Sequence, residues 1–197
     1  TPQIEYLIRL LKDTYKVAVL SRGYKRKTNG FVLLDKNHSA EDVGDEPLQY
    51  FKKFTNIDVA VDANRVMGIR KLIVKKAPEV VLLDDAFQHR KVKAGFNIVL
   101  TAFDNLYVND IILPAGDLRE SRSGAKRANI IVVTKCPKNL GILEQQKIVK
   151  KLNPTKDQEV FFSTVEYSIV LRGSSDISIE DLKNYKILLI TGIANPN

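Results

Sequence analysis

The sequence has 197 residues, 44% of them hydrophobic, which is enough for one full-sized core or for one core and part of a second. Its formal charge of +8 favours anionic partners such as nucleotides, lipid headgroups or nucleic acid, although lysine pairs on amphipathic stretches are also typical of a solvated surface. The single cysteine, Cys136, excludes an internal disulfide, and these residues contain neither an apolar run of membrane-spanning length nor a signal-peptide pattern.

Apolar runs of strand length alternate with amphipathic segments, which is typical of an α/β fold with a mostly parallel sheet covered by helices. Strands are expected at 16–20, 57–61, 80–83, 97–100 and 129–133. Because these runs are apolar throughout, we expect them to be buried on both faces. Helices are expected near 4–11, from 45 onward with Asp45 as its cap, at 66–77 with Asp62 as its cap, and at 143–152.

The pattern changes after Pro154, where apolar and polar residues alternate between 165 and 172 as in an antiparallel ribbon. The final segment returns to a buried-strand pattern at 187–190, followed by Thr191 and Gly192. We therefore expect an α/β core at 1–153, a linker ribbon at 154–185, and the start of a second α/β domain at 186–197.

Two adjacent carboxylates, Asp84 and Asp85, follow the apolar run 80–83. In open α/β sheets ligands bind outside the carboxyl ends of the strands, where acidic groups can hold Mg²⁺ on nucleotide phosphates. This is the pattern of a Walker B strand, although an aspartate after an apolar strand is also common for capping reasons.

A P-loop should accompany such a strand, yet the G-x-x-x-x-G-K-[ST] pattern is absent from these residues. Thr1 and Pro2 precede the first helix, so Thr1 stands where the hydroxyl residue of a P-loop would stand. The same two residues also fit an ordinary N-cap and first-turn proline. If a P-loop and its strand belong before Thr1, two strands of the sheet should show unpaired edges.

Several segments in one order resemble the signatures of the tetraacyldisaccharide 4'-kinases, a family that phosphorylates a lipid A precursor. The similar segments are Ser21-Arg22-Gly23-Tyr24, Gly44-Asp45-Glu46-Pro47, Asp84-Asp85-Ala86-Phe87-Gln88-His89-Arg90, Leu113-Pro114-Ala115-Gly116-Asp117-Leu118-Arg119-Glu120, Thr134-Lys135-Cys136-Pro137 and Gly192-Ile193-Ala194-Asn195-Pro196. Two positions depart from the family pattern, because Lys25 and Ala86 stand where glycine is frequent.

The resemblance implies roles for particular residues in phosphoryl transfer. Asp45 maps to the base that acts on the sugar 4'-hydroxyl, and Arg119 would stabilise charge on the phosphate. The metal ligands would be Thr1, Glu46, Asp84 and Asp85; the nucleotide would contact Thr1, Gln88, His89 and Glu120; and Arg22 would contact the anionic lipid substrate. From the residues alone, helix capping is the better account of Asp45, and Arg22 fits a surface ion pair.

The resemblance also implies ATP and Mg²⁺ as cofactors, a lipid A disaccharide precursor as substrate, and peripheral contact with the cytoplasmic face of the bacterial inner membrane. No obligate protein partner is implied, and the chain alone is expected to be soluble and inactive as a kinase. Two alternatives remain from the strand pattern and the charge: a P-loop kinase or ATP-dependent ligase acting on a soluble metabolite, and a basic nucleic-acid-binding module. The second lacks aromatic residues interleaved with its basic residues.

Overall fold

The computed structural model describes residues 1–171, 173 and 175–188. Its α-helices are α1 (Pro2–Leu11), α2 (Ala40–Val43), α3 (Asp45–Lys53), α4 (Arg65–Lys76) and α5 (Ile142–Leu152). Its strands are β1 (Val17–Ser21), β2 (Val32–Leu33), β3 (Asp58–Val61), β4 (Val80–Leu83), β5 (Ile98–Ala102), β6 (Ile130–Thr134), β7 (Glu159–Phe162), β8 (Val170–Leu171) and β9 (Ile177–Ser178). Short 3-10 segments are η1 (Tyr107–Asn109), η2 (Arg122–Arg127) and η3 (Ile179–Asn184).

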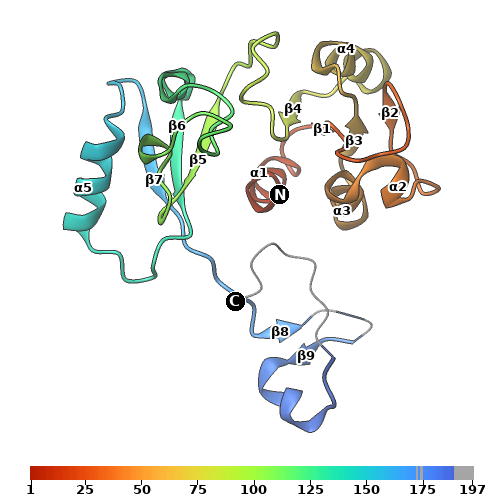
Figure 1. Cartoon of the computed structure of the whole chain (residues 1–197). Coiled ribbons are helices and arrows are strands. Elements are labelled where there is room, and N and C mark those ends of the chain that lie inside the picture. Colours follow the sequence, from red (N-terminus) through yellow and green to blue (C-terminus); the bar gives the residue numbers. More distant parts are fainter. Residues whose placement is uncertain (172, 174, 189–197) are drawn as a thin grey trace.

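The first sheet has the order β2-β3-β1-β4, with β1 parallel to both β3 and β4 and β2 antiparallel to β3 (Figure 1). Residues alternate between the two faces of a strand, so Val19 packs in the core with Ile8 of α1 and Tyr50 of α3, whereas Leu20 packs with Leu72 of α4. Helices thus cover both faces of β1, which is why all five of its residues are buried. Full burial of such an aliphatic side chain contributes roughly 1.5–3 kcal/mol.

The second sheet is parallel, in the order β5-β6-β7, and carries α5 on its core side. Ile131 and Val133 of β6 are fully buried and share a core with Ile148 and Leu152 of α5. The expected α/β class with mostly parallel strands flanked by helices is therefore confirmed.

Each sheet has one open edge directed toward the other sheet. Among the described residues, β4 pairs only with β1 and β5 pairs only with β6, and Figure 1 shows these two strands on the sides of their sheets that face each other. Side chains along β4 are only partly buried, and Leu100 of β5 is 48% exposed. The prediction that the strands are buried on both faces is confirmed for β1. It is wrong for β4 and β5, because these two strands lack a second strand neighbour in this structure.

Two expected helix caps differ in the structure. Gly44 is the N-cap of α3 and Asp45 is its first residue, so the Asp45 side chain does not cap the helix. Asn64 rather than Asp62 caps α4, with its side-chain oxygen accepting from the Met67 amide at 3.2 Å. The Asp62 carboxylate instead accepts from the Asn64 amide at 2.9 Å, which shapes the turn before the helix.

The region after residue 153 combines both kinds of sheet. Strand β7 pairs in parallel with β6, so part of the range 154–185 extends the second sheet rather than an antiparallel ribbon. Strands β8 and β9 pair antiparallel, and β8 is the part of the alternating stretch 165–172 that the structure describes as a strand. The strand expected at 187–190 falls largely outside the described residues.

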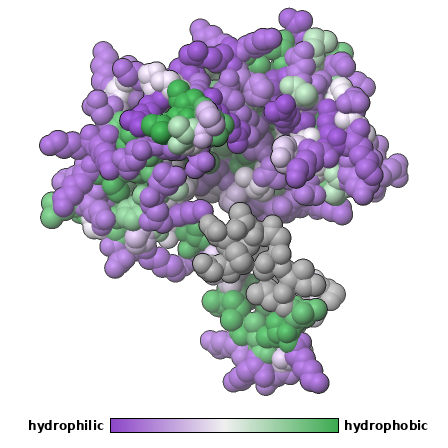
Figure 2. Space-filling view, viewed as in Figure 1, coloured by the Kyte–Doolittle hydropathy of each residue, from purple (hydrophilic) through white to green (hydrophobic). Residues whose placement is uncertain are grey.

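No helix in the described part of the chain is both long enough and apolar enough to span a bilayer. Figure 2 shows that hydrophilic residues cover most of the visible face of the two sheets and their helices, with smaller apolar areas between them.

Candidate active site

The carboxyl ends of β1, β3 and β4 meet at one rim because the three strands are parallel. The start of α3 lies against this rim through a contact between two glycines. A Cβ atom on Gly23 would lie 2.8 Å from the Val43 carbonyl oxygen, and one on Gly44 would lie 3.3 Å from the Gly23 Cα. Both glycines have positive φ angles, +68° and +95°, which side chains disfavour. The backbones of the segments Ser21-Arg22-Gly23-Tyr24 and Gly44-Asp45-Glu46-Pro47 are therefore in contact.

A polar cluster joins the end of β4 to the starts of α3 and α1. Asp84 is buried, and its Oδ2 accepts a hydrogen bond from the Tyr50 hydroxyl at 3.0 Å. The Thr1 hydroxyl donates to the Glu46 carboxylate. These four residues form what we call the acidic cluster: Thr1, Glu46, Tyr50 and Asp84.

The two carboxylates of the acidic cluster, Glu46 and Asp84, repel each other. Burial, followed by the charge of Glu46, raises the pKa of Asp84, although the hydrogen bond from the Tyr50 hydroxyl acts in the opposite direction. Burial and the Asp84 carboxylate likewise raise the pKa of Tyr50, so its hydroxyl keeps its proton and remains a donor. A bound cation would relieve this repulsion.

Hard oxygen donors of the kind that Mg²⁺ prefers are present in the acidic cluster, on Thr1, Glu46 and Asp84. Within the described ranges, however, no group of three or more acidic, histidine or cysteine side chains could by itself hold a metal ion. The residues fit a metal that takes most of its ligands from a bound nucleotide and water, as Mg²⁺ usually does.

Asp45 and Asp85, two further expected carboxylates, are both exposed. Asp45 is next to Glu46 at the start of α3, where the helix dipole favours a negative charge. Asp85 has a φ of +45°, and its carboxylate forms an ion pair with Arg119 Nη1 at 2.5 Å. The buried member of the acidic pair therefore faces Glu46, and the exposed member faces Arg119.

Arg119 and Arg127 tie the loop after β4 to the segment that contains Glu120. Arg127 donates to the Phe87 carbonyl oxygen at 2.8 Å and to both Glu120 oxygens at 2.9 and 3.1 Å, and its guanidinium lies 4.5 Å from the centre of the Phe87 ring. Glu120 is thus held by an arginine of the same region. Sequence reasoning did not identify Arg127, because η2 lies outside the signature segments.

The side chains of the loop after β4 differ in their surroundings. Gln88 Nε2 donates to the Asp85 carbonyl oxygen at 3.2 Å, which closes the loop on itself. Burial, together with the positive charges of Arg65 and Arg22, lowers the pKa of His89, so its imidazole is neutral at pH 7. A neutral imidazole can either donate or accept a hydrogen bond here.

Arg65 was also missed by sequence reasoning and lies at the same rim, as the first residue of α4. Only 3% of the residue is exposed; Nη1 donates to the Asp62 carbonyl oxygen at 2.7 Å, and Nε has no hydrogen-bond partner in the described structure. Burial and then the nearby guanidinium of Arg22 lower the pKa of Arg65. An arginine at the start of a helix carries no pattern by which a sequence would reveal it.

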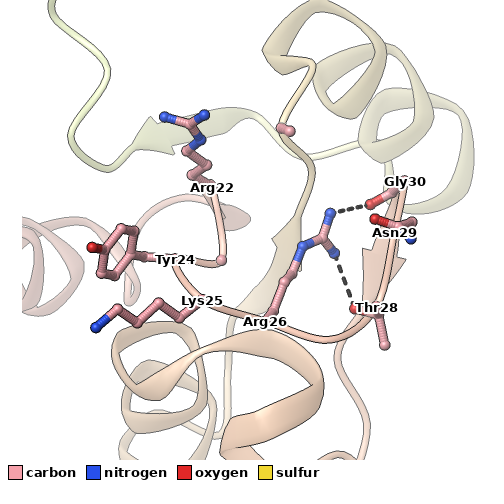
Figure 3. Close-up of a pocket in the computed structure, with 9 residues that line it drawn as sticks. Arg22, Tyr24, Lys25, Arg26, Thr28, Asn29 and Gly30 are labelled. Carbon is pink, nitrogen blue, oxygen red and sulfur yellow. Dashed lines mark hydrogen bonds between the residues drawn. The ribbon is translucent and has the colours of Figure 1, made fainter.

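A pocket of about 320 Å³ opens beside the Gly23–Gly44 contact. Its walls include Arg22, Tyr24, Lys25, Arg26, Thr28 and Gly30. Figure 3 shows Arg26 turned toward Gly30 and Thr28, while Tyr24 and Lys25 extend together in another direction. We call this the basic pocket.

Comparisons with known proteins agree on one family. The sequence profile of the tetraacyldisaccharide-1-P 4'-kinase family matches residues 1–197. Curated tetraacyldisaccharide 4'-kinases from Flavobacterium johnsoniae and from Bacteroides fragilis (strain YCH46) are 56% and 48% identical over the whole chain. The chain spans 58% and 55% of the lengths of these two relatives.

A solved structure gives the same result. The crystal structure described as the "apo" form of LpxK from Aquifex aeolicus in complex with ATP superposes with a TM-score of 0.61 at 29% identity. The similarity covers 84% of this chain and 66% of that chain. The match over every residue, the identity to curated relatives and the shared fold together place this chain in the tetraacyldisaccharide-1-P 4'-kinase family.

Proposed function

We propose that this chain forms part of an enzyme that transfers the γ-phosphoryl group of ATP to the 4'-hydroxyl of a tetraacyldisaccharide 1-phosphate. The observation that carries the proposal is the acidic cluster at the rim, where Asp84, Glu46 and Thr1 gather oxygen donors at the carboxyl end of β4. The names of the relatives and the ATP of the Aquifex aeolicus structure support the same reaction.

The nucleotide phosphates would lie over the acidic cluster. Mg²⁺ would be held by oxygen atoms of Thr1, Glu46 and Asp84 and, when bound, would neutralise charge on the phosphate oxygens. Asp85 would assist these metal ligands, and its ion pair with Arg119 would bring a guanidinium to the nucleotide phosphates. Arg119 is exposed, so its remaining N–H groups can donate to a phosphate in bidentate fashion.

Asp45 would accept the proton of the attacking hydroxyl. Its carboxylate is exposed, takes no part in capping, and sits in the first turn of α3, where the helix dipole stabilises the ionised form. A base must be accessible to the acceptor, and the exposed Asp45 carboxylate meets this requirement. Gln88, His89 and Glu120 would contact the nucleotide, and Arg22 would contact the anionic acceptor.

The acceptor is a lipid, so we also propose that the whole protein works peripherally at the cytoplasmic face of the bacterial inner membrane. The formal charge of +8 is consistent with attraction to an anionic leaflet.

The test is a kinase assay on the protein extended to the length of its relatives, with labelled ATP and tetraacyldisaccharide 1-phosphate in mixed micelles. We expect transfer of label to the lipid, and we expect Asp45→Ala to lower kcat by about 10²–10⁴-fold while ATP affinity stays within about twofold. Glu144→Ala removes an exposed first-turn carboxylate of α5 and serves as the matched control. Absence of transfer, or an unchanged kcat in Asp45→Ala, contradicts the proposal.

A further inference from the structure

Two arginine side chains connect the first sheet to the second at the candidate site. Among the described residues, the only hydrogen bonds between the chain before Gly95 and the chain after it are those of Arg119 and Arg127. Arg119 Nη1 donates to Asp85 Oδ2 at 2.5 Å, and Arg127 Nη2 donates to the Phe87 carbonyl oxygen at 2.8 Å. Both acceptors belong to the loop after β4, which runs from one sheet toward the other (Figure 1).

The two bonds differ in their exposure to solvent. The side chains of Arg119 and Asp85 are 57% and 62% exposed, whereas those of Arg127 and its partner Glu120 are 32% and 25% exposed. An exposed ion pair contributes little, and Arg119 is the arginine that would turn to the nucleotide phosphates. The contact that holds the loop when Arg119 does so is therefore that of Arg127.

Arg127 binds two parts of the candidate site at once. Its guanidinium donates to both Glu120 carboxylate oxygens, at 2.9 and 3.1 Å, and lies 4.5 Å from the centre of the Phe87 ring. The Phe87 ring in turn packs against the buried core of the second sheet. The planar fork of an arginine makes this double contact, which the single ammonium group of a lysine cannot reproduce. One side chain therefore fixes both Glu120 and the loop after β4.

Gly124 leaves the space that the Glu120 carboxylate needs. A Cβ atom on Gly124 would lie 2.7 Å from Glu120 Cδ and 2.9 and 3.0 Å from the two carboxylate oxygens. Gly124 is buried and, like Arg127, belongs to η2. The Glu120 carboxylate thus lies between Gly124 and Arg127, and each of its oxygens keeps a lone pair for a further donor.

We propose that Arg127 and Gly124 are positioning residues of the nucleotide site. Together they hold Glu120 and the loop after β4 in one arrangement, so that groups from both sheets reach the same nucleotide. The inference rests on the proposed function, which assigns Glu120 and Asp85 to that site. Arg127 acts through Glu120 and Phe87, so its loss should weaken ATP binding more than it weakens binding of the lipid acceptor.

The test is a calorimetric titration of the protein extended to the length of its relatives, with Mg²⁺ and a non-hydrolysable ATP analogue. We expect Arg127→Met to raise the Kd of the analogue about tenfold or more, while the KM for the lipid stays within about twofold. Arg127→Lys should give a smaller increase. A merely structural loss would instead lower the number of binding sites per protein, because the molecules that remain folded would keep the parent Kd.

Gly124→Ala tests the same arrangement without removing a hydrogen-bond donor. Its methyl group would meet the flexible end of Glu120, so the fold should be kept while the carboxylate is displaced. We expect the Kd to rise about threefold or more, because a displaced carboxylate makes poorer hydrogen bonds. Gly95→Ala is the matched control, since a Cβ there meets nothing within 4 Å, and Lys126→Met is the control for charge in η2. Both controls should keep the parent Kd.

Glu120→Gln shows whether Arg127 acts through Glu120. When this change is combined with Arg127→Met, the Kd should rise no further than in the weaker-binding single variant, because the two side chains act as one unit. An unchanged Kd in Arg127→Met or in Gly124→Ala, equal increases in the controls, or fully additive increases in the double variant would overturn the proposal. Nucleotide binding that depends on Arg127, in a protein that transfers no phosphate to the lipid, would reject the proposed function and support the positioning role.

Discussion

The Tyr50 hydroxyl donates to Asp84 Oδ2 at 3.0 Å, and this bond connects α3 to the end of β4 in the interior of the protein. Tyr50 is fully buried and Asp84 is 7% exposed, so neither group can exchange this bond for water. The bond joins the helix that begins with the proposed base to the strand that ends in the acidic pair. The position of Asp45 relative to the Asp84 carboxylate therefore depends on a hydrogen bond made by Tyr50, further along α3.

Asp84→Asn should make the protein more stable at neutral pH. Burial and Glu46 raise the pKa of Asp84 above its ordinary 3.8, so the folded state binds this proton more tightly than the unfolded state. Stability therefore falls as pH rises from 3.8 through the raised folded pKa and then stays level. Asparagine keeps an acceptor for Tyr50 and removes the charge, so we expect a gain of about 1 kcal/mol in urea denaturation at pH 7.

At pH 3 the free energies of unfolding of Asp84→Asn and of the parent chain should be nearly equal, because the parent carboxyl is then protonated. Asp85→Asn is the control, since its exposed ion pair contributes less than about 1 kcal/mol. A loss of stability in Asp84→Asn at pH 7 would mean that the acidic cluster is already compensated in the folded protein.

Glu5 should give the opposite pH dependence. Burial raises its pKa, but hydrogen bonds from Lys53 Nζ at 2.6 Å and Gln49 Nε2 at 2.8 Å outweigh burial and leave the pKa below the ordinary 4.5. The stability that Glu5 contributes is therefore present above pH 4.5 and lost as pH falls through the lower folded pKa. Glu5→Gln should lower the free energy of unfolding at pH 7 by about 1–3 kcal/mol.

Urea denaturation at pH 7 and pH 3 checks this prediction, with the difference between Glu5→Gln and the parent shrinking at the lower pH. Glu41→Gln removes an exposed partner of Lys27 and should change stability by less than about 0.5 kcal/mol at either pH. A difference that grows on acidification would show that Glu5 is stabilised in its protonated form.

The parallel strands and amphipathic helices could be predicted because each has a local pattern. The apolar run at 80–83 ends in Asp84 and Asp85 in the structure as in the sequence, and α5 begins within one residue of the expected position. Strand β2 has only two residues, which is too short a run to be recognised. Strand β7 follows a polar turn, and nothing in its sequence indicates that it pairs with β6.

The partners of the site residues could not be predicted, because they depend on contacts between distant segments. Asp45 and Glu46 are adjacent and both acidic, yet it is Glu46 that meets Thr1. Arg65 and Arg127 were also missed: Arg65 is buried at the start of α4, and Arg127 donates to the Phe87 carbonyl oxygen of a distant segment. The expected caps of α3 and α4 were misplaced by one and two residues: Asp45 lies within the first turn of α3, and Asp62 stabilises the turn before α4.

Arg127 should control the order of the loop after β4. Arg127→Met keeps most of the side-chain length but removes the bonds to the Phe87 carbonyl and to Glu120. We expect a loss of about 1–3 kcal/mol in stability and faster hydrogen exchange of the amides at 84–90, because the loop loses its main attachment to the Glu120 segment. Hydrogen exchange followed by mass spectrometry measures this directly.

Two variants sharpen the Arg127 prediction. Arg127→Lys keeps the charge without the planar fork, so it should recover only part of the protection. Lys126→Met changes an exposed neighbour of the same charge and should leave exchange at 84–90 unchanged. Equal protection in Arg127→Met and the parent would mean that the ion pair of Asp85 with Arg119 alone holds the loop.

Gly23→Ala and Gly30→Ala should separate backbone strain from steric conflict at the Gly23–Gly44 contact. Both glycines have nearly the same φ, +68° and +67°, but a Cβ on Gly23 would lie 2.5 Å from Arg26 Cδ and 2.8 Å from the Val43 carbonyl oxygen, whereas a Cβ on Gly30 meets nothing within 4 Å. Gly30→Ala should therefore cost about 1 kcal/mol, from conformation alone. Gly23→Ala should cost at least about 2 kcal/mol more, because the backbone before α3 must also move.

In the full-length enzyme only Gly23→Ala should lower kcat, since it displaces the start of the helix that carries Asp45. Equal costs for the two variants in urea denaturation would show that the two signature segments do not rely on close backbone contact.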